Sequence, residues 1–164
     1  MVRSSYYIPT LTTDVARGFR VTDPSLGVLL LIPYRHLEQR VLAAVHAAGH
    51  PLTLAQARMA QRIDDDGSRL TRLAESAQVT KPTAGYLVDQ LERDGYVERV
   101  ADPRDARARL IRFTPKGHEV IALARQVQDA VEDEWREHLG ERRSRALLEA
   151  LLALRPLTDP YVED

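Results

Sequence analysis

The sequence predicts a mainly α-helical protein that carries one small β-hairpin. From about Pro33 onward, apolar residues recur every three or four positions, which is the period of a helix that packs by one face. Residues 96–100 and 109–114 are instead short runs rich in β-branched and aromatic residues, as strands are. Together these observations favour a helical fold with a single hairpin.

A chain of 164 residues is long enough for one domain with terminal extensions, and it can bury a core without disulfides. The sequence contains no cysteine, which excludes thiolate metal sites and is typical of the reducing cytoplasm. The apolar run at residues 28–32 is too short to span a bilayer and lacks the basic segment of a signal peptide. We therefore expect a cytoplasmic protein with no membrane partner.

The first part of the chain is divided by its period and its capping residues. Residues 1–27 show no sustained periodicity, and we expect an N-terminal arm or extension there. Three helices are predicted next. The first runs from about residue 33 to Gly49, the second from the cap Thr53 to residue 63, and the third over residues 68–77.

The stretch from Thr80 to Gly95 has the clearest helical signals. Thr80 is a good N-cap, Pro82 is tolerated in a first turn, and Gly95 is a natural stop. One face is an apolar stripe, made of Ala84, Leu87, Val88 and Leu91. The other face is polar and carries Lys81, Thr83, Tyr86, Gln90 and Arg93. With the short helix before it, this pattern predicts a helix-turn-helix.

Two arginines, Arg104 and Arg107, alternate with Asp102 and Asp105 on the turn of the predicted hairpin. The minor groove of DNA is narrow and strongly negative, and an arginine inserted there reads its width more than its sequence. We expect the arginines to enter that groove and the aspartates to orient them or to close the turn. The alternative is a solvated, charged turn.

Two helices are predicted at the C-terminal end. Thr114 and Pro115 begin a long one, which Gly140 interrupts, and the last contains the leucines from Leu147 to Leu154 and ends at Pro156. This last helix and the run at residues 28–32 offer more apolar surface than a monomer of this size buries. A homodimer is therefore expected.

The polar face after Thr80 suits a DNA duplex. The major groove admits one α-helix, and only there are all four base pairs distinguishable. Lys81 and Thr83 lie at the helix N-terminus, where a phosphate is favoured. Tyr86 and Gln90 follow on the same face, and a glutamine can pair with adenine. An ordinary solvated helix face is the alternative for these two residues.

The distribution of charge supports a local phosphate-facing surface. Residues 68–117 contain ten Lys or Arg against seven Asp or Glu, a balance of +3. The rest of the chain contains thirteen against seventeen, a balance of −4, and the total is −1. A cationic central segment between anionic segments fits a nucleic-acid-binding face on a soluble protein.

A series of sequence motifs runs through the helix-turn-helix, the hairpin and the helix after it. They are Leu70-x-x-Leu73-Ala74, Val79-Thr-Lys-Pro-Thr83, Leu87-Val-Asp-Gln-Leu-Glu-Arg-Asp-Gly-Tyr-Val97, Arg99, Asp102-Pro-Arg-Asp-x-Arg107 and Phe113-Thr-Pro-Lys-Gly117. This set resembles the MarR family of bacterial winged helix-turn-helix regulators. The resemblance covers about residues 33–155, and the wing motif followed by hydrophobic-Thr-x-x-Gly is its specific part.

The resemblance implies a homodimer whose first and last helices interlock. Its two winged domains would read a palindromic operator in double-stranded DNA, with half-sites about 10 bp apart. It also implies a transcriptional regulator, a repressor that a small aromatic or phenolic effector releases from a crevice between the two parts. The effector-binding residues are not identified by it.

Carried over residue by residue, the DNA-binding positions are Thr80, Lys81, Pro82, Thr83, Tyr86, Gln90, Arg104 and Arg107. The chain departs from the family at Ala106, where a second basic residue is common, and in its longer N-terminal extension. The lack of cysteine excludes the peroxide-sensing thiol mechanism of one branch.

We therefore divide the chain into four parts. Residues 1–27 form an N-terminal arm, and residues 28–52 a first dimerisation helix. Residues 53–117 form the winged helix-turn-helix domain, and residues 118–164 the C-terminal dimerisation helices.

The main alternative is a winged-helix module that binds a protein partner and no DNA, with its wing arginines paired to an acidic surface. An enzyme is not expected, because the sequence has no nucleophile–base pair at informative spacing and no phosphate loop. No cofactor or metal is expected either. His46 and His50 have a spacing that zinc ligands use, but Gly49 lies between them at a helix end, and residues 64–67 lack the alternation of a calcium loop.

Overall fold

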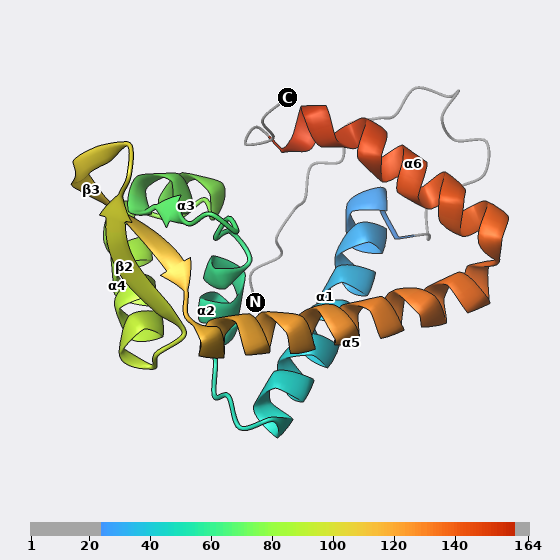
Figure 1. Cartoon of the computed structure of the whole chain (residues 1–164). Helices are drawn as coiled ribbons and strands as arrows, with labels where there is room; N and C mark the ends of the chain where they lie inside the picture. The colour runs from blue at the N-terminus through green and yellow to red at the C-terminus, as the bar shows by residue number, and fades with distance from the viewer. Residues whose placement is uncertain (1–23, 160–164) are drawn as a thin grey trace, which may run out of the picture. The chain divides into compact units, whose positions relative to one another are not determined.

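The computed structural model describes residues 24–159, apart from the side chain of Ala106, and confirms a mainly helical fold with a small sheet (Figure 1). In chain order its elements are α1 (Leu26–Ala47), α2 (Leu54–Ala60), β1 (Ser68–Arg69), α3 (Leu70–Ser76), α4 (Lys81–Arg93), β2 (Val97–Asp102), β3 (Asp105–Phe113), α5 (Pro115–Leu139) and α6 (Glu141–Thr158). The described residues divide into two compact units between His36 and Leu37. Most of the predicted N-terminal arm, residues 1–27, lies outside the described residues.

Threonine caps set the beginnings of three helices, as predicted. The side chains of Thr53, Thr80 and Thr114 each accept a hydrogen bond from the backbone N–H three residues later. After α4, Gly95 has a φ of 77°. This left-handed conformation costs glycine little, so it ends the helix without strain.

Helix α1 begins earlier than predicted, at Leu26, and Pro33 lies inside it. The four leucines before the proline have high helix propensity, so the helix tolerates the one backbone donor that Pro33 lacks. The prediction of a start near Pro33 was therefore wrong by about two turns.

The sheet has three antiparallel strands in the order β1-β3-β2, one more than predicted. Ser68 and Arg69, expected to open a helix, are extended and pair with Ile111 and Leu110 of β3. Backbone pairing with a distant strand takes precedence over the local helical pattern here. Helix α3 therefore begins at Leu70.

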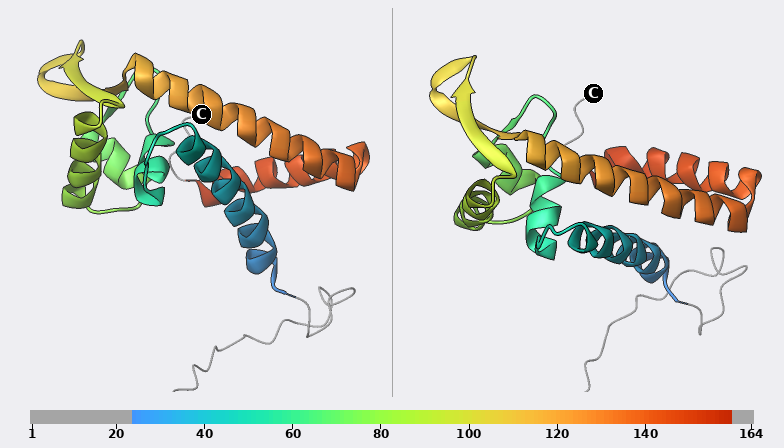
Figure 2. Two further views of the ribbon diagram at one scale, coloured as in Figure 1. Left: turned by 90° about the horizontal axis from the view of Figure 1, so that it is seen from below. Right: turned by 60° about the horizontal axis from the view of Figure 1, so that its bottom comes forward.

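The β2–β3 hairpin is also tighter than predicted. Asp102 lies opposite Asp105, so only Pro103 and Arg104 form the turn. Arg107, expected in a loop, lies on β3. In both views of Figure 2 the turn of this hairpin projects clear of the helices.

The core of the second unit is built around the apolar stripe of α4, and that stripe is buried as predicted. Its members Ala84, Leu87, Val88 and Leu91 are each at most 8% exposed. They share one cluster with side chains of the neighbouring helices and strands, namely Met59, Leu73, Val97, Ile111 and Val120. Helix α4 is thus held by one face.

Helices α5 and α6 run back along each other after Gly140 (Figures 1 and 2). Val120 and Val131 of α5 are buried, whereas α6 has no buried residue. No described helix is long and apolar enough to cross a membrane.

Candidate nucleic-acid interface

The polar face of α4 points outward. Thr80, Lys81, Pro82 and Thr83 are exposed, and Tyr86 is 62% exposed although it is a large aromatic side chain. Gln90, the sixth predicted contact on this helix, is half-buried. The buried stripe on the other side fixes this orientation, because the helix has one apolar face and the core covers it.

The first turn of α4 offers fewer backbone donors than expected for a phosphate site. The N–H of Thr83 already donates to Thr80 Oγ1 at 3.3 Å, and the two hydroxyl groups lie 2.8 Å apart. Pro82 has no N–H to give. The ammonium group of Lys81 and its own N–H are therefore the groups that an anion would meet at this helix end.

Asp102 closes the hairpin turn, as predicted, and Asp105 makes the same kind of bond at the start of β3. The N–H of Arg104 donates to Asp102 Oδ1 at 2.8 Å, and the N–H of Arg107 donates to Asp105 Oδ1 at 3.1 Å. Each aspartate thus holds the backbone of the arginine two residues later. Both arginines are exposed.

Arg69 of β1 contacts this hairpin, and the sequence did not predict that contact. From β1, its Nε donates to Asp102 Oδ2 at 2.8 Å, and its Nη2 lies 3.7 Å from Asp105. The Asp102 side chain is only 4% exposed. The N–H of Arg104 and then the guanidinium of Arg69 hold the pKa of Asp102 below its usual value of 3.8.

Arg99 ties the hairpin to α4. It lies on β2, and its Nη2 donates to Asp89 Oδ1 at 2.6 Å, while Nη1 donates to Glu92 Oε2. The sequence showed Arg99 only as a member of a motif, without a role. The ion pairs join the strand that leads to the wing with the helix that carries the polar face.

Another ion pair joins the C-terminal half of α1 to α2. Arg58 donates through Nε and Nη2 to the two oxygens of Glu38, at 2.6 and 2.8 Å. The Glu38 side chain is 7% exposed, whereas that of Arg58 is 51% exposed. The two parallel hydrogen bonds orient the guanidinium of Arg58 against the carboxylate of Glu38.

The histidines considered as metal ligands have protein partners. His46 Nε2 lies 2.7 Å from the carbonyl oxygen of Leu52, and His50 Nδ1 lies 3.3 Å from the Tyr96 hydroxyl. Asp64, from the segment compared with a calcium loop, accepts a hydrogen bond from Ser68. Within residues 24–159, no group of three or more side chains is placed to hold a metal ion.

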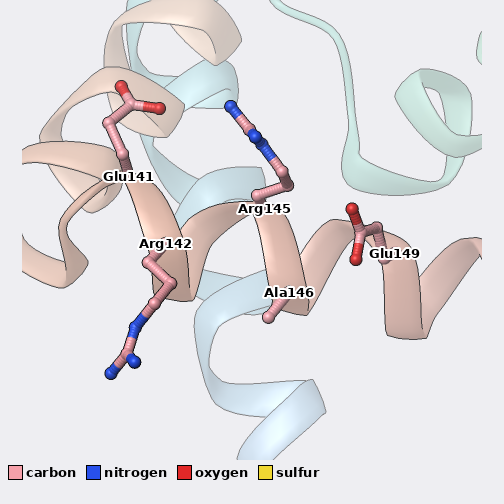
Figure 3. Close-up of a pocket in the computed structure, with 5 residues that line it drawn as sticks. All are labelled: Glu141, Arg142, Arg145, Ala146 and Glu149. Carbon is pink, nitrogen blue, oxygen red and sulfur yellow. The ribbon is translucent and has the colours of Figure 1, made fainter.

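A hollow on α6 is lined by Glu141, Arg142, Arg145, Ala146 and Glu149, as Figure 3 shows. All five residues come from one helix, and four of the side chains are charged. Pockets that hold aromatic ligands are mostly apolar and enclosed. This hollow therefore does not resemble a site for the expected aromatic effector.

Comparison with known proteins agrees with this architecture. The sequence pattern of the MarR family matches residues 50–108, which cover α2 to the wing. The transcriptional regulator HosA of Escherichia coli O111:H- is 33% identical over 72 residues, which is 44% of this chain and 53% of HosA. The match thus spans about half the length of that relative.

Solved structures extend the likeness to most of the chain. The crystal structure of MarR has a TM-score of 0.61 at 27% identity and covers 79% of this chain and 93% of its own. The MepR–DNA complex of S. aureus has a TM-score of 0.62 at 19% identity, over 80% of this chain and 97% of MepR, which shows a shared fold. Residues 50–108 thus match the MarR family, and the described part of the chain shares its fold with the solved structure of MarR.

Proposed function

We propose that this protein binds a palindromic DNA operator as a homodimer and represses transcription there. The observation that carries the proposal is the outward polar face of α4, held by a buried stripe. A helix held in this way can enter the major groove, where base edges are distinguishable. The same fold occurs with DNA in the MepR complex.

The candidate contacts divide into three kinds. Tyr86 and Gln90 lie beyond the first turn of α4 and would meet base edges, whereas Lys81 would meet a phosphate. Arg104 and Arg107 on the projecting hairpin would enter the minor groove beside it. Thr80, Pro82 and Thr83 complete the contact face at the start of the helix.

Exposed apolar side chains support the homodimer. On α6, Leu148 and Leu152 are 58% and 53% exposed, and on α1, Leu26 and Ile32 are 64% and 59% exposed. Water-exposed leucine faces on two helices are unfavourable in a lone chain and favourable at an interface between copies. A dimer would present two α4 helices to successive major grooves, about 10 bp apart.

Release by a small aromatic or phenolic effector is part of the proposal and rests on the family alone. It is tested by adding a panel of phenolic compounds to a preformed protein–duplex complex. Dissociation by one of them at constant salt is the expected result, and an unchanged complex across the panel would remove the effector from the proposal.

The decisive experiment is selection of bound duplexes from a random pool by the full chain. We expect an enriched palindrome with half-sites one helical turn apart, bound with an affinity that falls steeply as salt rises. The competing function is a winged-helix module for a protein partner. Recovery of no sequence, together with no salt-dependent binding to any duplex, would favour that module.

Substitutions then separate two of these kinds of contact. Arg107→Ala is expected to weaken binding to all duplexes, because it removes a cation from the strongly negative minor groove. Gln90→Ala is expected to change which sequences bind best, because it removes a base contact worth about 1–3 kcal/mol. If electrophoretic mobility shifts show neither effect, the contacts assigned to α4 and to the wing are wrong.

A further inference from the structure

Asp89 is an acidic residue on the outer face of α4. It follows Tyr86 by three residues and precedes Arg93 by four, so the three side chains lie along one line of the helix. This line is opposite the buried stripe, and the Asp89 side chain is 58% exposed. A base-reading helix therefore carries a carboxylate in the middle of its outward line.

The carboxylate is fixed through one of its two oxygens. Nη2 of Arg99 donates to Oδ1 at 2.6 Å, from a side chain that is itself only 30% exposed. Within the described residues, Oδ2 accepts no hydrogen bond. Asp89 thus has a set orientation and one oxygen that remains to accept a bond from outside.

Glu92 provides an internal comparison, because it shares the same arginine. It follows Asp89 by three residues, so it lies about 60° further round the helix. Its side chain is 38% exposed, against 58% for Asp89, and Arg99 reaches it from β2. Arg99 thus binds two carboxylates, and Asp89 is the one on the outward line.

A fixed carboxylate discriminates between base edges in the major groove. Cytosine presents the N4 amino donor there, whereas guanine presents the acceptors O6 and N7, and thymine presents O4. Adenine offers a donor at N6 but an acceptor beside it at N7. An oxygen that only accepts is attracted to cytosine and repelled by the acceptor-rich bases, and the neighbouring guanidinium offsets its repulsion from the phosphates.

We propose that Asp89 is a specificity-determining residue that accepts a hydrogen bond from the amino group of a cytosine, and that Arg99 positions it. The inference rests on the proposed function, since it concerns the same face of α4. The inference adds Asp89 to the residues that contact a base, and it adds Arg99 as a residue that acts by positioning Asp89.

The test is duplex selection with the full chain in four forms: the native protein, Asp89→Asn, Glu92→Gln and Arg99→Met. The native protein is expected to select cytosine at one position of each half-site and to lose roughly tenfold in affinity when it is replaced. Asp89→Asn is expected to shift that position toward adenine, which asparagine pairs with. Glu92→Gln should leave the preference for cytosine at that position unchanged, and Arg99→Met should weaken it.

The outcomes distinguish this inference from the proposed function. If the native protein selects no duplex, both are overturned. A second outcome is that the native protein selects a palindrome and Asp89→Asn binds all duplexes more tightly with an unchanged base preference. Asp89 then only repels the DNA phosphates, and the inference is overturned. The same conclusion holds if Glu92→Gln shifts the base preference as Asp89→Asn does.

Discussion

At the scale of single residues, the wing depends on a carboxylate that is almost fully buried. Asp102 accepts bonds from the Arg104 backbone and from the Arg69 side chain, and its own side chain is 4% exposed. A buried carboxylate without partners would be strongly unfavourable. These two partners therefore hold the turn in the conformation that presents Arg104.

Asp102→Asn is expected to lower the melting temperature at neutral pH, because the amide loses the ionic bond to Arg69. The pKa of Asp102 is lowered in the folded state, so its contribution is present above the usual value of 3.8 and is lost as the pH falls through the lowered pKa. The difference in melting temperature between native protein and variant should therefore stay constant from pH 7 to about pH 5 and shrink as the pH falls below 3.8.

Asp105→Asn is the matched control for this pH series. Asp105 is 44% exposed and lies 3.7 Å from the same Arg69 nitrogen, so its loss should have a smaller effect. A difference for Asp102→Asn that stays constant down to acidic pH would contradict the assigned role of the ionic bond.

At the scale of elements, Gly117 allows α5 to begin against the hairpin. A Cβ atom at this position would lie 2.1 Å from the carbonyl oxygen of Tyr96. That oxygen already accepts a hydrogen bond from the N–H of Thr114 at 3.1 Å, so it cannot easily move aside. The glycine of the Phe113-Thr-Pro-Lys-Gly117 motif thus has a steric cause.

Gly117→Ala is expected to destabilise the protein by about 2–4 kcal/mol, because the overpacked methyl group pushes α5 away from β2. Gly85→Ala, within α4, is the control, since a Cβ there would meet only Leu70 Cδ2 at 3.9 Å. This second change should stabilise by about 0.5–1 kcal/mol through helix propensity. Urea denaturation measures both, and equal effects would show that the contact at Gly117 relaxes freely.

At the scale of the whole molecule, oligomerisation is the property that the exposed leucines of α6 predict. Leu148→Lys with Leu152→Lys places two charges on residues that are 58% and 53% exposed in the single chain. Burying these charges at an interface would be costly. The variant is expected to sediment as a monomer and to lose at least about tenfold in affinity for a palindromic duplex.

Gln126→Lys on the exposed side of α5 is the control for added charge, and it should remain a dimer. If the double variant sediments like the native protein, α6 is not the interface, and the role proposed for the exposed leucines is incorrect. Binding to a duplex with a single half-site should change little in either variant, because α4 and the wing are untouched.

The features predicted correctly depend on residues close together in the chain. Buried and exposed positions of α4 follow from a helical period, and the caps at Thr53, Thr80 and Thr114 follow from hydrogen bonds over three residues. The aspartate-closed wing turn is equally local. The error at α1 has a local cause too, since Pro33 was taken as a boundary and lies within the helix.

Residues near one another in the chain are therefore sufficient to predict which faces are apolar, where α2, α4 and α5 begin, and that Tyr86 and the wing arginines are exposed. Contacts between distant parts of the chain instead make Ser68 and Arg69 a strand, bring Arg69 to Asp102, and join Arg99 to Asp89 and Glu92. The physical reason is that strand pairing and ion pairs join groups far apart in the chain. A local sequence pattern does not predict such pairs, because they stabilise the protein only after folding has brought the distant groups together.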